Sequence, residues 1–160
     1  MKKTRLICLL LCLSFLLCGC DPTWWSCGEV LQEEVAKVEL IYYYCAEATV
    51  HAYTGFGDEK VLPFDSQKAE VLETLSQDKQ EEFLVDLAIC RLWAGAEYAD
   101  SPSGFSLRLT YSDGSFAVIS VLGTLICHYA ANGEVLRVIG APIDLAKYYE
   151  LIREHFETKI

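Results

Sequence analysis

Cysteine is the most reactive side chain in this sequence of 160 residues, which contains eight cysteines. Four of them, Cys27, Cys45, Cys90 and Cys127, lie well beyond an apolar N-terminal segment, and four thiols allow three pairings and one or two disulfides. The last three each lie in an apolar stretch, where cysteine is usually a small buried hydrophobic residue, so we expect Cys27 to stay unpaired. No C-x-x-C occurs, which argues against thioredoxin-like redox chemistry and against a zinc knuckle.

The three histidines do not form a metal-binding pattern. His51, His128 and His155 have no histidine partner at a spacing of four and no nearby carboxylates at coordinating spacing. We therefore expect neither a metal site nor a cofactor.

A cysteine hydrolase is tested by the adjacent pair Cys127 and His128. Neighbours on a strand point to opposite faces, so His128 cannot act as the base for Cys127. Pairs of Cys90 or Cys45 with His51 or His155 remain open, and nothing favours them. We expect no catalytic residues and no enzymatic activity.

A basic patch is the strongest candidate for a binding site. Two predicted hairpins place Leu107, Leu109, Tyr111, Phe116 and Val118 on one face of a sheet, and an Asn-Gly turn pairs His128 with Arg137. If that apolar set faces helices, then Arg108, His128 and Arg137, with Tyr43, lie together on the open face. Such a patch would bind an anionic or extended ligand, such as a peptide carboxylate or a wall polymer. The alternative is that these are solvated residues paired with local acids, such as Glu39 or Glu134.

The elements that would position this patch follow from hydrophobic periodicity. Residues 35–44 alternate with period two, which predicts a strand. Residues 49–65 read as a long loop with a short strand near 50–53, and residues 69–75 fit either an edge strand or a helical turn. A helix is predicted from a Ser76 N-cap to about Leu92.

The second half of the chain contains the clearest turn signals. Strands at 107–111 and 116–120 flank Asp113-Gly114, strands at 125–130 and 135–139 flank Asn132-Gly133, and both dipeptides suit two-residue hairpin turns. A short amphipathic helix follows Pro142. The sequence thus predicts an α+β fold, an antiparallel sheet of about five strands with two helices packed on one face.

The N-terminus has the features of an export signal. Basic residues in Met1 to Arg5 precede thirteen residues, Leu6 to Cys18, in which Ser14 is the only polar one. This segment is shorter than the roughly 20 apolar residues that span a bilayer. We predict a cleaved signal peptide at 1–19, a tether at 20–34 and one globular domain at 35–160.

The residues Leu17-Cys18-Gly19-Cys20 resemble the lipobox of bacterial lipoproteins. The resemblance implies that signal peptidase II cuts after Gly19 and that Cys20 carries a diacylglycerol, so that two acyl chains anchor the protein to the cell membrane. Cys18 departs mildly from the usual Ala, Ser or Thr. The element order and the Tyr111-Ser-Asp-Gly114 hairpin are similar to small uncharacterised lipoproteins of Gram-positive bacteria, a family that implies no activity.

The charge of the chain excludes nucleic acid as a partner. The formal net charge is −10, and it becomes −13 without residues 1–19, which hold three basic and no acidic side chains; phosphates would be repelled. We therefore expect an exported, membrane-anchored lipoprotein that faces the outside of the cell, or the periplasm of a Gram-negative cell. Its domain would bind a cell-envelope protein or polymer without catalysis. The alternatives are an inhibitor or immunity-like module against a secreted enzyme, and a cell-envelope hydrolase.

Overall fold

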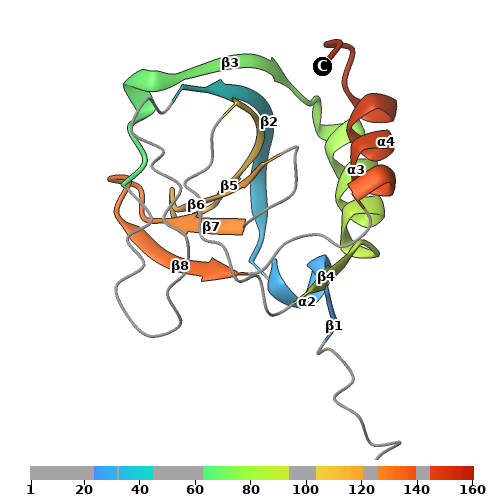
Figure 1. Ribbon diagram of the computed structural model, residues 1–160, viewed down its shortest axis with the longest axis horizontal. Coiled ribbons are helices and arrows are strands. Elements are labelled where there is room, and N and C mark those ends of the chain that lie inside the picture. The colour runs from blue at the N-terminus through green and yellow to red at the C-terminus, as the bar shows by residue number, and fades with distance from the viewer. Residues whose placement is uncertain (1–23, 32, 45–62, 94–103, 121–125, 140–144) are drawn as a thin grey trace, which may run out of the picture.

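The computed structural model describes residues 24–31, 33–44, 63–93, 104–120, 126–139 and 145–160. Its main feature is a six-stranded antiparallel sheet in the order β3-β2-β5-β6-β7-β8 (Figure 1). The strands are β2 (Val35–Tyr43), β3 (Ala69–Thr74), β5 (Gly104–Tyr111), β6 (Phe116–Ser120), β7 (Ile126–Tyr129) and β8 (Val135–Ile139). The predicted α+β class is confirmed, with six strands instead of about five. The additional strand is β3, an edge strand that follows the short 3-10 helix η1 (Ser66–Lys68).

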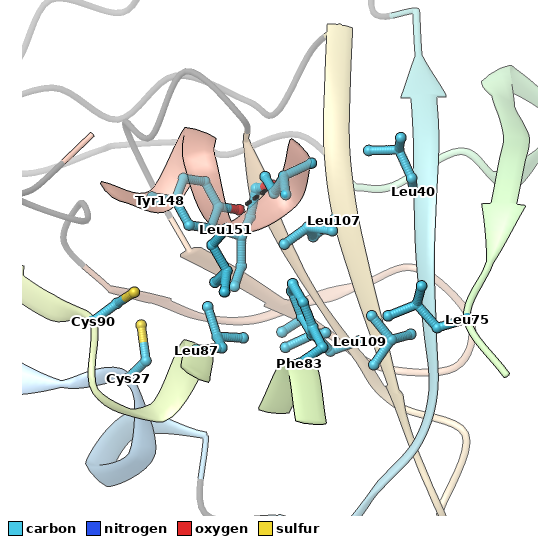
Figure 2. Close-up of a cluster of buried hydrophobic side chains, with 14 of the residues drawn as sticks. Cys27, Leu40, Leu75, Phe83, Leu87, Cys90, Leu107, Leu109, Tyr148 and Leu151 are labelled. Carbon is cyan, nitrogen blue, oxygen red and sulfur yellow. Dashed lines mark hydrogen bonds between the residues drawn. The ribbon is translucent and has the colours of Figure 1, made fainter. Parts of the chain in front are cut away.

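Two helices pack on one face of the sheet, which we call the helix face. They are α3 (Gln77–Ala88) and α4 (Leu145–His155), and they lie next to one another (Figure 1). Phe83, Leu87 and Ile152 on the helices pack with Leu40 and Leu107 on the sheet in one buried cluster. This burial removes large apolar side chains from water and is the main source of stability on this face. Figure 2 shows this cluster.

Helix α3 begins after Ser76, as the sequence predicts, but it ends at Ala88, before the predicted end near Leu92. The reason is that residues Arg91–Trp93 form strand β4, which pairs with β1 (Trp24–Ser26) in a separate two-stranded sheet. The apolar residues at positions 92 and 93 extend the helical pattern in the sequence, and the pairing with a distant strand overrides it.

The N-terminal part of the domain begins earlier than the predicted boundary at Val35. Strand β1 continues into the short helix α2 (Cys27–Val30), and the Cys27 side chain is 1% exposed within the main core. Part of the predicted tether is therefore folded. The stretch is too short for a periodic pattern, and its folding depends on the long-range pairing with β4.

The face of the sheet opposite the helices is also buried, and we call it the inner face. Ile41, Phe116 and Tyr129 form a second core cluster there with Phe64, whose ring lies 5.1 Å from that of Phe116 and 5.5 Å from that of Tyr129. The Phe64 backbone N–H donates a 2.8 Å hydrogen bond to the carbonyl of Gly133. The segment before β3 thus reaches the turn between β7 and β8. The prediction that this face of the sheet is open to solvent is wrong.

Several predictions lie outside the described residues. These are the signal peptide 1–19, the lipid attachment site Cys20, the strand near 50–53 with most of the long loop, and the helix start at Pro142. Within the described part of the chain, none of the helices has the length and apolar character needed to span a membrane.

Candidate functional site

The structure separates the four residues of the predicted basic patch. Adjacent strands align side chains in rows, and consecutive rows point to opposite faces of the sheet. Arg108 belongs to the inner-face row, and His128 and Arg137 belong to the next row, on the helix face. The inner-face row is Glu39, Arg108, Val118, Cys127 and Val138; the helix-face row is Val38, Leu109, Ala117, His128 and Arg137.

The cause is the length of the first hairpin turn. The Tyr111 N–H bonds to the Ser115 carbonyl and Thr110 pairs with Phe116, so three residues form the turn instead of the predicted two. A shift of one residue moves every side chain of a strand to the other face. Phe116 and Val118 therefore accompany Arg108 on the inner face, and the predicted face assignment of β6 is wrong.

The second hairpin also has a three-residue turn, because the Ala130 N–H bonds to the Glu134 carbonyl. A register shift between His128 and Tyr129 then adds one residue on β8 and restores the predicted pairing of His128 with Arg137. The predicted pairing of His128 with Arg137 is confirmed, although it results from a three-residue turn and a register shift instead of a two-residue turn.

Arg108 is held in an internal ion pair. Its Nε donates a 2.8 Å hydrogen bond to Oε2 of Glu39, and Nζ of Lys37 lies 3.0 Å from Oε1 of the same carboxylate. The side chain of Glu39 is 4% exposed and that of Arg108 is 16% exposed. Burial raises the pKa of Glu39, but hydrogen bonds and positive charge from Arg108 and Lys37 outweigh burial, and the pKa falls below its usual range.

This pairing changes what Arg108 can do. The ionised Glu39 carboxylate binds the Arg108 Nε–H and supplies an internal counter-charge, so an anionic ligand would compete with Glu39 for the guanidinium charge. The alternative considered for the basic residues was a pairing with local acids such as Glu39. Arg108 makes this pairing.

Tyr43 is part of the inner core. Its ring is 3% exposed and stacks on Phe64 with centroids 4.4 Å apart, and its hydroxyl accepts a 3.1 Å hydrogen bond from the Asp65 backbone N–H. Through these contacts Tyr43 holds the segment before β3 against the sheet. They leave Tyr43 on the same face as Arg108 and away from His128.

His128 retains features of a recognition residue. Its ring stacks on Tyr111, with centroids 6.1 Å apart and planes at 10°, and Arg137 lies opposite on β8. Burial and the nearby charge of Arg137 lower the pKa of His128, so the imidazole is neutral at pH 7. Among the residues that the structure describes, neither His128 Nε2 nor the Tyr111 hydroxyl has a hydrogen-bond partner, and both atoms are buried. Arg137 is therefore the single cation of this row at neutral pH.

The thiols of Cys27 and Cys127 are poorly suited to nucleophilic catalysis. Burial raises the pKa of Cys27 to about 12, with a smaller contribution from Cys90, and burial raises the pKa of Cys127 to about 11. A nucleophilic cysteine needs the opposite shift, because the thiolate is the reactive form.

A groove between α3 and α4 was not identified from the sequence. It has a volume of about 240 Å³, and it is lined by the acids Asp86, Glu150 and Glu154, by the cation Lys147 and by the apolar residues Ile89, Cys90 and Leu151. Ile89 is 60% exposed. The spacing of four between Glu150 and Glu154 indicates that both lie on one side of a helix. Spacing does not show that Asp86 on another helix lies beside them.

No group of His, Cys, Asp and Glu with the arrangement of a metal site occurs within the described ranges. Comparison of the chain with protein-family models, with curated proteins and with solved structures finds no match.

Proposed function

We propose that this protein is an exported lipoprotein, anchored to the membrane through acylated Cys20, whose domain binds a partner in the cell envelope without catalysing a reaction. The observation that carries the anchoring is the lipobox-like sequence Leu17-Cys18-Gly19-Cys20, which precedes strand β1 by only a few residues. A fully extended chain from Cys20 to Trp24 reaches at most about 14 Å. The domain would therefore sit against the membrane surface.

The anchoring is tested by the mature N-terminus. We expect mass spectrometry of the membrane fraction to give a protein that begins at a diacylated Cys20. A Cys20→Ala variant should remain unprocessed and unlabelled by a palmitate analogue, whereas Cys18→Ala should be processed and labelled as the wild type is. A mature protein that begins at another residue would contradict the proposal.

The binding role is favoured over a cysteine hydrolase by the state of the thiols. Cys27 and Cys127 have raised pKa values, so both should resist alkylation of the folded protein at pH 7 and react after denaturation in the presence of a reductant. Rapid alkylation of either thiol in the folded state would support the hydrolase instead.

An inhibitor or immunity-like module is the second candidate, and the acidic groove between α3 and α4 favours it. Three carboxylates outnumber the one lysine, Lys147, around exposed Ile89, so the groove combines an apolar contact with net negative charge, which suits a cationic protein surface. We would measure binding of an oligolysine peptide at several salt concentrations. Glu150→Gln/Glu154→Gln should weaken it more than Glu70→Gln/Glu134→Gln, which removes the same charge from exposed positions elsewhere. Equal weakening would show a general charge effect and would count against the groove.

A further inference from the structure

Two buried thiols face one another where β1 joins the domain. Ser26 of β1 pairs with Arg91 of β4, so the next pair in this antiparallel register is Cys27 and Cys90. The Cys27 N–H donates a 2.8 Å hydrogen bond to the Cys90 carbonyl, which extends the pairing by that one step. The two residues are separated in sequence by the whole of β2, β3 and α3.

The spacing of the two backbones suits a covalent link. Directly opposed residues in an antiparallel pair have Cα atoms roughly 4.5–5.5 Å apart; here one hydrogen bond joins the two residues, because the Cys90 N–H bonds to the Leu87 carbonyl. Disulfides in proteins most often join Cα atoms roughly 5.5–6 Å apart. Figure 2 shows the two sulfur atoms side by side, next to Leu87 and Tyr148.

The side-chain environment agrees with this proximity. The proximity of Cys90 adds to the effect of burial in raising the pKa of Cys27. Burial, and then the proximity of both cysteines, raises the pKa of the Tyr148 hydroxyl. Helix α2 is also pressed against α3, because a methyl group added at Gly28 would lie 3.2 Å from the Ala88 side chain. The cysteines are thus held together by elements that pack closely on both sides.

Among the cysteines that the structure describes, which do not include Cys45, one pairing is singled out. Cys27 and Cys90 belong to the core cluster under the helices, whereas Cys127 belongs to the inner-face cluster on the other side of the sheet. All three are thiols in this structure. The sequence predicts an unpaired Cys27 because no local pattern indicates that β1 pairs with β4, which brings Cys27 opposite Cys90.

We propose that Cys27 and Cys90 form a structural disulfide in the exported protein. The bond arises by exchange with a disulfide oxidant, either a small molecule or a protein: the Cys27 and Cys90 thiols lose two hydrogens, the new S–S bond forms, and the oxidant's S–S bond is reduced to two thiols. The inference rests on the proposed export, since a reducing cytoplasm would keep both thiols reduced.

The bond fixes the N-terminal segment to the body of the domain. Cys27 and Cys90 are 1% and 5% exposed, so the bond is largely shielded from solvent reductants, with Cys90 at the wall of the groove between α3 and α4. Without the bond, β1 is held by its pairing with three residues of β4 and by the packing of α2. The disulfide would make the link between the membrane anchor and the domain independent of this short pairing.

The test uses the full-length protein, purified in detergent. The protein is denatured and reduced, refolded with a mixture of oxidised and reduced glutathione, blocked with an alkylating agent under denaturing conditions, and digested for mass spectrometry. We expect a peptide pair joined through Cys27 and Cys90, with a mass two hydrogens below the sum of the reduced peptides. Alkylation of both residues, or a link from either to another cysteine, would overturn the proposal.

Two variants serve as controls. Cys27→Ser should abolish the cross-linked peptide and leave Cys90 open to alkylation, and Cys127→Ser should keep the Cys27–Cys90 peptide. Because refolding takes place in vitro, a missing bond disproves the pairing whether or not the protein is exported. A wrong mature N-terminus in the membrane fraction would disprove only the anchoring.

Discussion

At the scale of single residues, two glycines share a backbone conformation but differ in their surroundings. Gly114 and Gly133 have φ angles of 85° and 86°, which side chains of L-residues rarely tolerate. A Cβ at Gly114 would have an ordinary contact with the Ala131 side chain, whereas a Cβ at Gly133 would overlap the Phe64 carbonyl oxygen. Gly133 therefore permits both a turn and the approach of the segment before β3.

We predict that Gly114→Ala and Gly133→Ala differ in stability. Both variants lose about 1–2 kcal/mol from the left-handed backbone. Gly133→Ala should lose roughly 1–3 kcal/mol more, because Phe64 must move away from the turn. Urea unfolding of the two variants measures the difference, and equal losses would show that the contact of Phe64 with Gly133 contributes nothing.

The ion pair on the inner face gives a second prediction. Glu39→Gln leaves Arg108 with little solvent and no counter-charge, so we expect a loss of about 2 kcal/mol in the free energy of unfolding. Lys37 is 47% exposed, and Lys37→Gln should lose less than about 1 kcal/mol. Equal losses of unfolding free energy in the two variants would contradict this prediction, because they would show that Arg108 does not depend on the Glu39 charge.

At the scale of elements, the docking of the chain end onto β3 depends on one carboxylate. Glu73 accepts hydrogen bonds from the backbone N–H groups of Glu157 and Thr158 and from the Thr158 hydroxyl, each with one contact of 2.9 Å. Burial raises the pKa of Glu73, but these hydrogen bonds outweigh burial and hold the pKa below its usual value of 4.5. The ionised carboxylate thus ties the residues after α4 to the edge strand.

We predict that Glu73→Gln loosens the residues after α4. Because the folded pKa is depressed, the stabilisation is complete above about pH 4.5 and is lost as the pH falls below this value. The variant should lose about 1 kcal/mol at pH 7 and should show faster amide hydrogen exchange at Glu157 and Thr158. Glu70→Gln, at an exposed position on the same strand, is the control and should leave both amides protected.

Elements with local signals could be predicted, and those that depend on distant pairing could not. The structure contains the strand predicted at residues 35–44 and the start of α3 after Ser76. It also contains the predicted glycine turns between β5 and β6 and between β7 and β8. Asp113-Gly114 indicates a turn but does not fix its length, and one additional turn residue moved Val118 to the face of Arg108. The predicted basic patch failed for this reason.

At the scale of the whole molecule, the proposed disulfide closes a long loop. In the chain-entropy model, a link between Cys27 and Cys90 stabilises the fold by about 4 kcal/mol, because it restricts the unfolded chain. We expect the oxidised protein to have a higher melting temperature than the reduced protein. Cys27→Ala should melt at the same temperature with and without reductant, near that of the reduced wild type. A wild type that is insensitive to a strong reductant under unfolding conditions would contradict this expectation.

If the protein is exported as proposed, the pairing of β1 with β4 also sets an order of events during export. A chain that crosses the membrane from its N-terminus delivers β1 first, whereas β4 follows only after β2, β3 and α3 have crossed. Strand β1 therefore has no partner while the early part of the domain emerges, because non-local pairs wait for the later strand. Under that proposal, the cleavage site beside Cys20 would be processed during this interval, before docking of β1 completes the domain.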